Sequence, residues 1–568
     1  MLSHPFSLTP TEPPAGARPS EFNEFFNSRY RIVRRLGRGG MSTVYLAKDT
    51  HHADRLVSLK RVRRDGHTGG RAIESLRNEF LSVAAVPHPG VARAHDFGAD
   101  SATGDHFFTY EYVSGVHWLE AMKSLDIATP DGFEAFIDIL AQMLRALEFI
   151  HFRGLIHGDI KPQNILIAPL EARPGLCRAP PEQRYSVKII DFGLARGELT
   201  LDDTKIFGTP YYIAPETILG SPADRRADLY SLGVVLYHLS TGQLPFRAES
   251  HLEVLKDHLE RPPAPPRELA PFLPRGLEAV ILRLMEKKPE DRFSRAGEVI
   301  DRLNSDLGVR LPIETPETCA SYLEVAMPVA REREMVHLRD VVAGVLAVDT
   351  AARTEAPAPA HRMVIVRGEE GSGKQRLVDE LRRVAQTWGV SFVTVDCARP
   401  SALPSPGCDA LSTRSGILAM ARQLLERSRE CPVVLHFHDL HLAGQQVFEI
   451  VATLAALMSN GSIPGNRFTM TATAVEGGEA VNAMFQLFSR SPIYRDNVLE
   501  ILLARLDAAE VARFLEATFN GLALPETLVW EIVEKGRGNL QAILDLVLLE
   551  VRDERIRRTA AGWIHGQV

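Results

Sequence analysis

The stretch His157-Gly158-Asp159-Ile160-Lys161-Pro162-Gln163-Asn164 decides how this chain is interpreted. Two further strings follow it in order, Asp191-Phe192-Gly193 and Gly208-Thr209-Pro210-Tyr211-Tyr212-Ile213-Ala214-Pro215-Glu216. Asp159 can orient a hydroxyl group for attack on a phosphate, and Asn164 and Asp191 can hold magnesium ions that neutralise that phosphate. One such string alone is an ordinary turn sequence, whereas three in this order predict a site for phosphoryl transfer.

The N-terminal region supplies the other parts of such a site. A glycine-rich segment lies between two predicted strands, and its glycines at 37 and 39 let the backbone fold closely over phosphates, because no Cβ intervenes. The predicted strand 57–62 carries Lys60, and the predicted helix 72–86 carries Glu79 as the ion-pair partner of that lysine. The expected nucleotide-binding loop consists of Leu36, Gly37, Arg38, Gly39, Gly40, Met41, Ser42, Thr43 and Val44.

Together these residues resemble the bacterial branch of the eukaryotic-like Ser/Thr protein kinases over roughly residues 30–307. The resemblance implies a two-lobed protein-kinase fold of the α+β class, in which a small β-rich lobe with one main helix precedes a mostly helical large lobe. It also implies that ATP and Mg²⁺ bind between the lobes. The catalytic residues would be Asp159, Lys161, Asn164, Lys60 and Glu79, and the metal ligands Asn164 and Asp191.

The same resemblance assigns contacts to the rest of the nucleotide and to the large lobe. Val44 and Leu166 would sandwich the adenine ring, and the hinge from Glu111 to Val113 would bind it through the backbone. Asp228 and Arg292 would brace the large lobe, with Arg292 pairing to Glu216.

Two features bear on substrate and control. Lys161 and Thr209 are the forms found in Ser/Thr kinases, so serine and threonine hydroxyls of proteins are the expected substrates. Gly158 replaces the arginine that normally precedes the catalytic aspartate and helps to grip a phosphorylated activation loop. We therefore expect that phosphorylation of Thr200 or Thr204 is not an obligatory on-switch.

Composition limits the classes of protein. The length of 568 residues predicts several domains, and 45% hydrophobic residues is typical of globular proteins. A net charge of −7 gives no basic field for nucleic acid, and the arginines between 552 and 558 read as the solvated face of a helix. Five cysteines without paired spacing favour reduced thiols, and no apolar run is long enough to span a membrane, so we expect a cytoplasmic protein.

A second glycine-rich loop lies in the C-terminal half. The predicted strand 363–366 runs into Gly368-Glu369-Glu370-Gly371-Ser372-Gly373-Lys374-Gln375, and a predicted helix follows. Strand, loop, lysine and helix predict a P-loop, in which backbone N–H groups and the helix N-terminus bind a polyphosphate. The expected nucleotide contacts are Gly368, Gly371, Gly373 and Lys374; a plain glycine-rich turn is the alternative.

The magnesium side of this P-loop departs from the usual pattern. Gln375 stands where a serine or threonine hydroxyl binds magnesium, and Asp439 is the only acid after the apolar strand 433–437. We therefore expect a degenerate site with little hydrolysis. His436, His438 and His441 could instead be read as a metal cluster, but His441 lies beyond the strand end, so we do not favour this interpretation.

The C-terminal half is similar to the AAA-like ATPase modules of the signal-transduction NTPases, an α/β P-loop fold with a helical lid. The resemblance implies regulation or scaffolding in signal transduction, with self-association or partner binding through this module. An active Ser/Thr kinase is favoured over a pseudoenzyme that only binds ATP, because Lys60, Asp159 and Asp191 are all present. We expect a disordered tail over 1–28, a kinase domain over 29–307, a linker over 308–325, an ATPase domain over 326–500 and a helical lid over 501–568.

Overall fold

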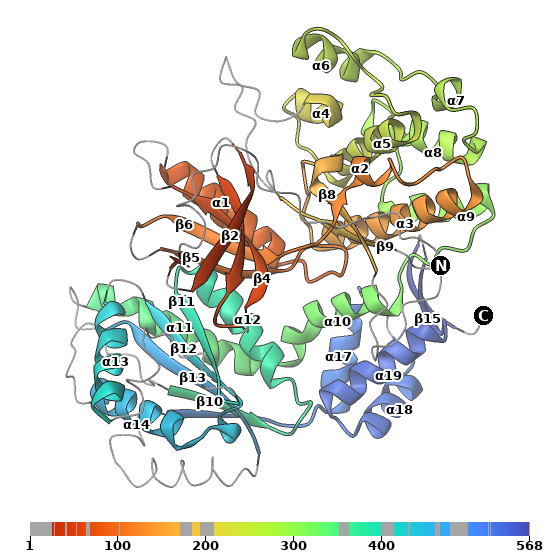
Figure 1. The fold of residues 1–568 in the computed structure, drawn as a ribbon. Coiled ribbons are helices and arrows are strands. Elements are labelled where there is room, and N and C mark those ends of the chain that lie inside the picture. The colour runs from red at the N-terminus through yellow and green to blue at the C-terminus, as the bar shows by residue number, and fades with distance from the viewer. Residues whose placement is uncertain are drawn as a thin grey trace, which may run out of the picture.

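The structure is a computed structural model that describes residues 25–566, apart from residues 28, 40–41, 53, 64–68, 101–102, 171–184, 193–209, 352–362, 399–413, 430–431, 460–465, 477–497, 521, 523 and 560. Figure 1 shows a two-lobed N-terminal half beside a C-terminal half made of an α/β domain and a group of helices.

The small lobe, red to orange in Figure 1, is an antiparallel sheet with the strand order β1-β2-β3-β4-β6-β5. Helix α1 packs on this sheet, because its Leu76 and Phe80 share an apolar cluster with Val62 and Phe108 of the strands. The elements are β1 (Phe25–Phe26), β2 (Tyr30–Arg38), β3 (Thr43–Asp49), β4 (Arg55–Val62), α1 (Gly69–Ala84), β5 (Ala94–Ala99) and β6 (His106–Glu111).

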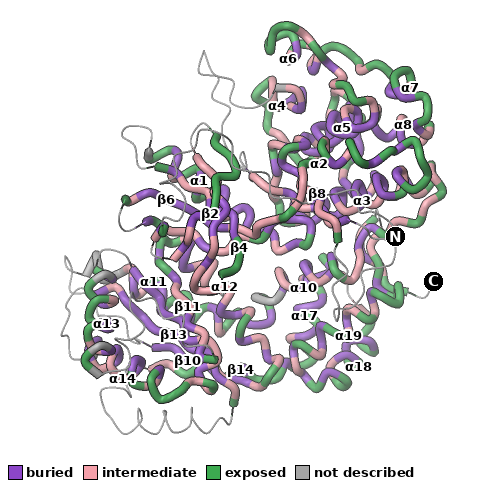
Figure 2. Tube along the Cα trace, in the orientation of Figure 1, coloured by how far each residue is buried: buried purple, intermediate pink, exposed green. Residues whose placement is uncertain are grey.

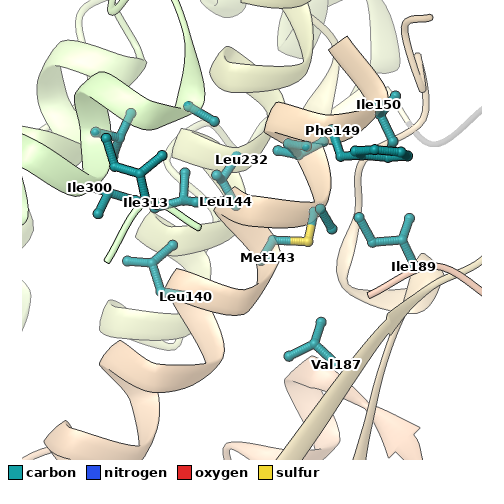
Figure 3. Close-up of a cluster of buried hydrophobic side chains, with 14 of the residues drawn as sticks. Leu140, Met143, Leu144, Phe149, Ile150, Val187, Ile189, Leu232, Ile300 and Ile313 are labelled. Carbon is teal, nitrogen blue, oxygen red and sulfur yellow. The ribbon is translucent and has the colours of Figure 1, made fainter. Parts of the chain in front are cut away.

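The large lobe is built around α3 (Pro130–Phe152). The hydroxyl of Thr129 caps this helix by accepting a hydrogen bond from the Gly132 N–H, and Pro130 follows at the first helical position. Its apolar side chains pack against strand and helix residues that include Val187, Leu232 and Ile300 (Figure 3). The further elements are β7 (Val116–His117), α2 (Trp118–Ala121), η3 (Pro162–Asn164), β8 (Ile165–Pro169), β9 (Tyr185–Ile189), η4 (Pro210–Tyr212), α4 (Pro215–Ile218), α5 (Arg225–Thr241), α6 (His251–Glu260), α7 (Pro266–Leu269), α8 (Arg275–Leu284), η5 (Pro289–Asp291) and α9 (Ala296–Leu307).

The α/β domain contains a five-stranded parallel sheet with the order β11-β12-β13-β10-β14. The central strands β10 and β13 are buried almost continuously along their length, as expected for a parallel sheet with helices on both faces. Two separate apolar clusters, one on each side of the sheet, form its core. The elements are α11 (Glu332–Ala351), β10 (Met363–Gly368), α12 (Lys374–Thr387), β11 (Ser391–Asp396), α13 (Arg414–Arg427), β12 (Val433–His438), η8 (Leu440–Leu442), α14 (Gln445–Ser459), β13 (Phe468–Val475) and β14 (Val498–Leu503).

The last body, which we call the helical body, comprises α10 (Pro316–Ala330), α17 (Ala508–Thr518), α18 (Glu526–Gly536), α19 (Leu540–Arg552) and the hairpin of β15 (Ile556–Thr559) and β16 (Gly562–His565). Its buried side chains belong to the same apolar cluster as the core of the large lobe. Figure 2 accordingly colours much of α3, α10 and α17 as buried. The helical body and the large lobe are therefore packed as one unit.

Four expectations need correction. The expected tail 1–28 contains β1, whose Phe26 is buried and packs edge-on against Phe107. The expected linker 308–325 contains most of α10, because Cys319, Tyr322 and Leu323 are buried apolar positions on a helix. The boundary after residue 500 falls inside β14.

The fourth correction concerns the arginines from 552 to 558. They are not one solvated helical face, since α19 ends at Arg552 and Arg558 lies in β15 with a largely buried side chain.

Among the described helices, none is both long and apolar enough to cross a membrane.

Candidate active site

Lys60 on β4 joins the two lobes through ion pairs. Its Nζ atom lies 2.7 Å and 2.8 Å from the two carboxylate oxygens of Glu79 on α1, and 2.5 Å from Oδ1 of Asp191 after β9. The Lys60 side chain is only 11% exposed. Burial lowers the pKa of Lys60, but attraction to Glu79 and Asp191 more than offsets this, so its pKa lies above the usual value and the ammonium stays charged.

The two carboxylates of this cluster differ. Burial and the nearby Asp191 raise the pKa of Glu79 above its usual value, against the opposing effect of Lys60. Burial also acts on Asp191, but Lys60 and a hydrogen bond with Glu79 lower the pKa of Asp191 to about 2. Asp191 therefore holds the negative charge that a metal ligand needs. Its φ of +64° is in the left-handed region that non-glycine residues rarely adopt, which is typical of strained functional positions.

The segment from 157 to 164 is held in place by Asp228 on α5. The Asp228 carboxylate accepts hydrogen bonds from the backbone N–H groups of His157 and Gly158, both at 2.9 Å, and lies 2.8 Å from Nε2 of His151. Burial raises the pKa of Asp228, but the hydrogen bonds and charges of its partners outweigh burial. Its pKa therefore lies below the usual value, and the carboxylate stays charged. Gly158 has a φ of +76°, a conformation that favours glycine, so the lack of a side chain at this position also has a local structural reason.

Asp159 sits at the centre of this segment. Its Oδ2 accepts hydrogen bonds from Lys161 Nζ at 2.6 Å and from Asn164 Nδ2 at 2.9 Å. Because the Asn164 amide nitrogen donates to Asp159, its amide oxygen is left as an acceptor. Asn164 and Asp191 thus offer an amide oxygen and a carboxylate, which are ligands that fit Mg²⁺.

The residues expected to bind nucleotide in the small lobe lie on two strands and in the turn between them. Leu36, Gly37 and Arg38 are on β2, Thr43 and Val44 are on β3, and the Gly39 N–H closes the turn by donating to Ser42 O at 2.8 Å. Gly40 and Met41 lie outside the described residues.

The residues expected to contact adenine lie at the end of β6, just after it, and on β8. Glu111 ends β6, Val113 follows it, and Leu166 lies on β8 opposite Lys188. The Lys188 ammonium donates to Glu111 at 2.7 Å.

Arg292 forms two hydrogen bonds with Glu216, at 2.7 Å and 2.8 Å, in a buried pair. Thr200, Thr204 and Thr209 lie outside the described residues.

The comparisons with known proteins agree with this geometry. The family model described as "Protein kinase domain" matches residues 30–302. The chain is 34% identical over 281 residues to serine/threonine-protein kinase PknB of Mycobacterium tuberculosis, and 35% identical over 300 residues to serine/threonine-protein kinase Pkn1 of Myxococcus xanthus. These matches cover 48% and 52% of this chain, and 42% and 41% of the relatives.

Residues 30–302 are a bacterial serine/threonine protein kinase domain. The chain spans about two fifths of the length of the curated relatives it matches. Kinase domains of this family use ATP and a divalent metal, in agreement with the oxygen ligands described above. The C-terminal half lies outside the match.

The second glycine-rich loop connects β10 to α12. Gly371 and Gly373 have positive φ values of +77° and +95°, and α12 begins at Lys374. The Lys374 ammonium folds back onto the carbonyl oxygens of Gly368 at 2.9 Å and Glu369 at 2.7 Å. Gln375 donates to Asp379 on the next turn of α12, at 3.1 Å.

A cavity of about 440 Å³ lies beside this loop. It lies beside the end of β10, between the α/β domain and α19, because Leu540, Gln541 and Leu544 form part of its wall. Parallel sheets bind ligands at the carboxyl ends of their strands, which is where this cavity is. The residues around it are Glu370, Gly371, Gly373, Lys374, Gln375, Arg376, His438, Asp439, His441, Leu442, Thr473, Val475, Leu540, Gln541 and Leu544.

The histidines near this cavity do not converge. His436 is buried and its Nδ1 lies 2.9 Å from the Thr471 hydroxyl, while His438 lies 3.3 Å from Asp439. Within the described part of the chain, no group of three or more histidines, cysteines or acids is placed to hold a metal ion.

Sequence reasoning missed the residues that join the two halves of the chain. Asp96 on β5 bonds to Arg382 and Gln386 on α12, and Arg558 on β15 pairs with Glu148 on α3. These partners are hundreds of residues apart, and no local spacing relates them.

Proposed function

We propose that the kinase domain transfers the γ-phosphate of ATP to serine and threonine hydroxyls of proteins. Asp159 would orient the hydroxyl and accept its proton as the new O–P bond forms and the bond to the β-phosphate oxygen breaks, releasing ADP. Lys161 would contact the migrating phosphate, and Lys60 the α and β phosphates. Mg²⁺ held by Asn164 and Asp191 supplies charge neutralisation when bound.

The observation that carries this proposal is the double ion pair of Lys60. Kinase activity requires the lysine of the small lobe to pair with the acid of α1 while the aspartate after β9 faces the cleft. Here Glu79 and Asp191 contact the same ammonium. This arrangement also favours the enzyme over a pseudoenzyme, because Lys60 keeps both of the acidic partners that phosphate transfer needs.

The substrate class can be tested directly. The 568-residue chain is incubated with γ-labelled ATP and a basic protein substrate, and the labelled amino acids are identified after hydrolysis. We expect phosphoserine and phosphothreonine. Phosphotyrosine as the main product would contradict the assignment of Lys161.

We further propose that the cavity beside β10 binds a nucleotide and turns it over slowly. The supporting observation is the glycine loop with Lys374 at the first turn of α12, opening onto a cavity large enough for a nucleotide. Gln375, which donates to Asp379, offers magnesium no hydroxyl. Slow turnover is expected because hydrolysis needs a well-placed metal and an activated water.

Nucleotide stoichiometry tests this second proposal. Equilibrium dialysis of the chain with ATP analogues should give two bound nucleotides in the wild type and one in Lys374→Ala. The chain with Asp159→Asn, which silences the kinase, should show little magnesium-dependent ATPase activity. A single nucleotide in both proteins would contradict the second site, and brisk ATPase activity would contradict its degeneracy. The cytoplasmic location and partner binding through the C-terminal half stay predictions.

A further inference from the structure

Helix α12 leads from the second glycine loop straight to the small lobe of the kinase. Its first residue is Lys374, and its last two turns carry Arg382 and Gln386. The Gln386 amide donates to Asp96 Oδ1 on β5 at 3.0 Å, and Arg382 forms an ion pair with the same oxygen. A helix of this length is a rod of roughly 20 Å. A displacement of the loop is therefore passed to β5 by one rigid element.

The contact on the small lobe is buried and charged. Asp96 is only 4% exposed, and its carboxylate also binds Arg29 at 2.9 Å and the Tyr30 hydroxyl at 3.2 Å. Arg383 of α12 donates to the carbonyl oxygen of Ala84, at 3.3 Å. Ala84 is the last residue of α1, the helix that carries Glu79. The α12 contact thus reaches the element that positions the Lys60 ion pair.

The helical body is anchored to the large lobe of the kinase domain. Arg558 of the hairpin binds Glu148 of α3 at 2.7 Å and Glu314 at 3.0 Å. Tyr322 of α10 packs between Phe149 of α3 and Trp563 of the hairpin, with ring centroids 4.8 Å and 5.5 Å apart. These contacts fix the helical body to the large lobe.

The cavity lies between these two anchored bodies. On one side is the glycine loop with α12, and on the other is the start of α19. The two sides already touch, since Asn539 donates to the Glu370 carbonyl oxygen at 2.8 Å and the Gln541 N–H donates to that of Gly371 at 3.0 Å. A ligand in the cavity contacts both sides at once, so its binding acts on the spacing of the two bodies.

We propose that nucleotide binding beside β10 regulates the kinase through α12, by shifting the small lobe and α1 relative to the large lobe. The proposal rests on the second proposed function. The coupling is reciprocal: a nucleotide in the kinase cleft changes the affinity of the second site by the same factor. The Asp96–Arg382 pair is the link on which transmission depends.

Hydrogen–deuterium exchange on the 568-residue chain tests the link, with saturating ADP as the probe. Protection of residues 368–376 reports binding at the second site, and exchange of residues 69–84 reports α1. Nucleotide bound in the kinase cleft also changes the exchange of α1. The response to the second site is therefore the change in α1 exchange rate on adding ADP in the wild type minus the same change in Lys374→Ala. We expect this difference to be about fivefold in exchange rate. Arg382→Ala should keep the protection of 368–376 and lose the α1 response, and Gln386→Ala, which removes only the second of the two contacts to Asp96, should weaken that response.

Arg422→Ala is the matched control, because Arg422 is an exposed arginine on α13 of the same domain. It should behave as the wild type in both segments. If residues 368–376 are protected while α1 responds equally in the wild type, Lys374→Ala and Arg382→Ala, binding stands and the coupling is overturned. If residues 368–376 show no protection in the wild type, the binding itself is overturned, and the coupling with it.

Discussion

Lys60 illustrates how single residues connect the two lobes of the kinase domain. One buried ammonium is shared by a carboxylate from α1 and a carboxylate that follows β9. Buried charges are tolerated only when they are paired and hydrogen-bonded, so the position of α1 and that of Asp191 are constrained together. A movement of α1 would leave Lys60 with one partner, which is why contacts on α1 can control the site.

Gly158 leads to a prediction about control by phosphorylation. Without an arginine at this position, a phosphate on the loop between Asp191 and Glu216 has one guanidinium fewer to bind. The double variant Thr200→Ala, Thr204→Ala should retain about half or more of the wild-type rate toward an added protein substrate. Initial rates with labelled ATP measure this. A rate reduced to that of Asp159→Asn would show that another basic pocket serves the loop.

Arg292 allows a prediction about stability. Its guanidinium is buried and forms two hydrogen bonds with the Glu216 carboxylate. Arg292→Ala leaves that carboxylate buried without its cation, and should lower the free energy of unfolding by about 3–5 kcal/mol. Urea unfolding of the variant and of Arg310→Ala, which removes an exposed arginine of the same lobe, measures the difference. Equal midpoints for both variants would contradict the role of this pair.

At the scale of elements, α10 and the C-terminal hairpin serve both halves of the chain. The cluster that contains the core of the large lobe continues through Tyr322 and Leu323 of α10 to Phe514 of α17 and Trp563 of β16. A fragment that begins near residue 326 would cut α10 and expose this surface. Experiments on the C-terminal half should therefore use the 568-residue chain and not a fragment.

Arg558 provides the matching prediction for the hairpin. It is held between Glu148 and Glu314, and burial raises the pKa of Glu314 despite the attraction of Arg558. Arg558→Ala removes the cation from two buried carboxylates and should destabilise the docked hairpin by about 3–5 kcal/mol. Faster deuterium exchange of residues 556–565 would report this loss. The neighbouring exposed Arg557→Ala should leave the exchange unchanged, and equal exchange in both variants would argue against the cluster.

At the scale of the whole molecule, the sequence predicted the parts whose chemistry depends on local spacing. The segment from 157 to 164, the glycine loops and the helix that carries Glu79 are short patterns with fixed geometry, and the structure brings them together. The linker was predicted wrongly because α10 is apolar toward partners that are distant in sequence, from α3 and from the end of the chain. The Asp96–Arg382 and Arg558–Glu148 contacts arise from tertiary packing, which no single-sequence pattern encodes.

The bodies of this chain are connected in two different ways, through a shared core and through one helix. The large lobe and the helical body share one core, the α/β domain has cores of its own, and α12 joins that domain to the small lobe. This arrangement permits the α/β domain to move as a unit while the small lobe stays attached to α12 and the large lobe stays attached to the helical body.

The central claim is that Asp159 serves the transfer of phosphate from ATP to protein hydroxyls, and one rate measurement tests it most directly. Initial rates of labelled phosphate transfer are compared for the wild type, Asp159→Asn and the control Asp131→Asn, an exposed aspartate in the first turn of α3. Asp159→Asn should lower the rate by about 10²–10⁴-fold while ATP binding is retained, and Asp131→Asn should keep the wild-type rate. Transfer by Asp159→Asn at the wild-type rate would contradict the claim.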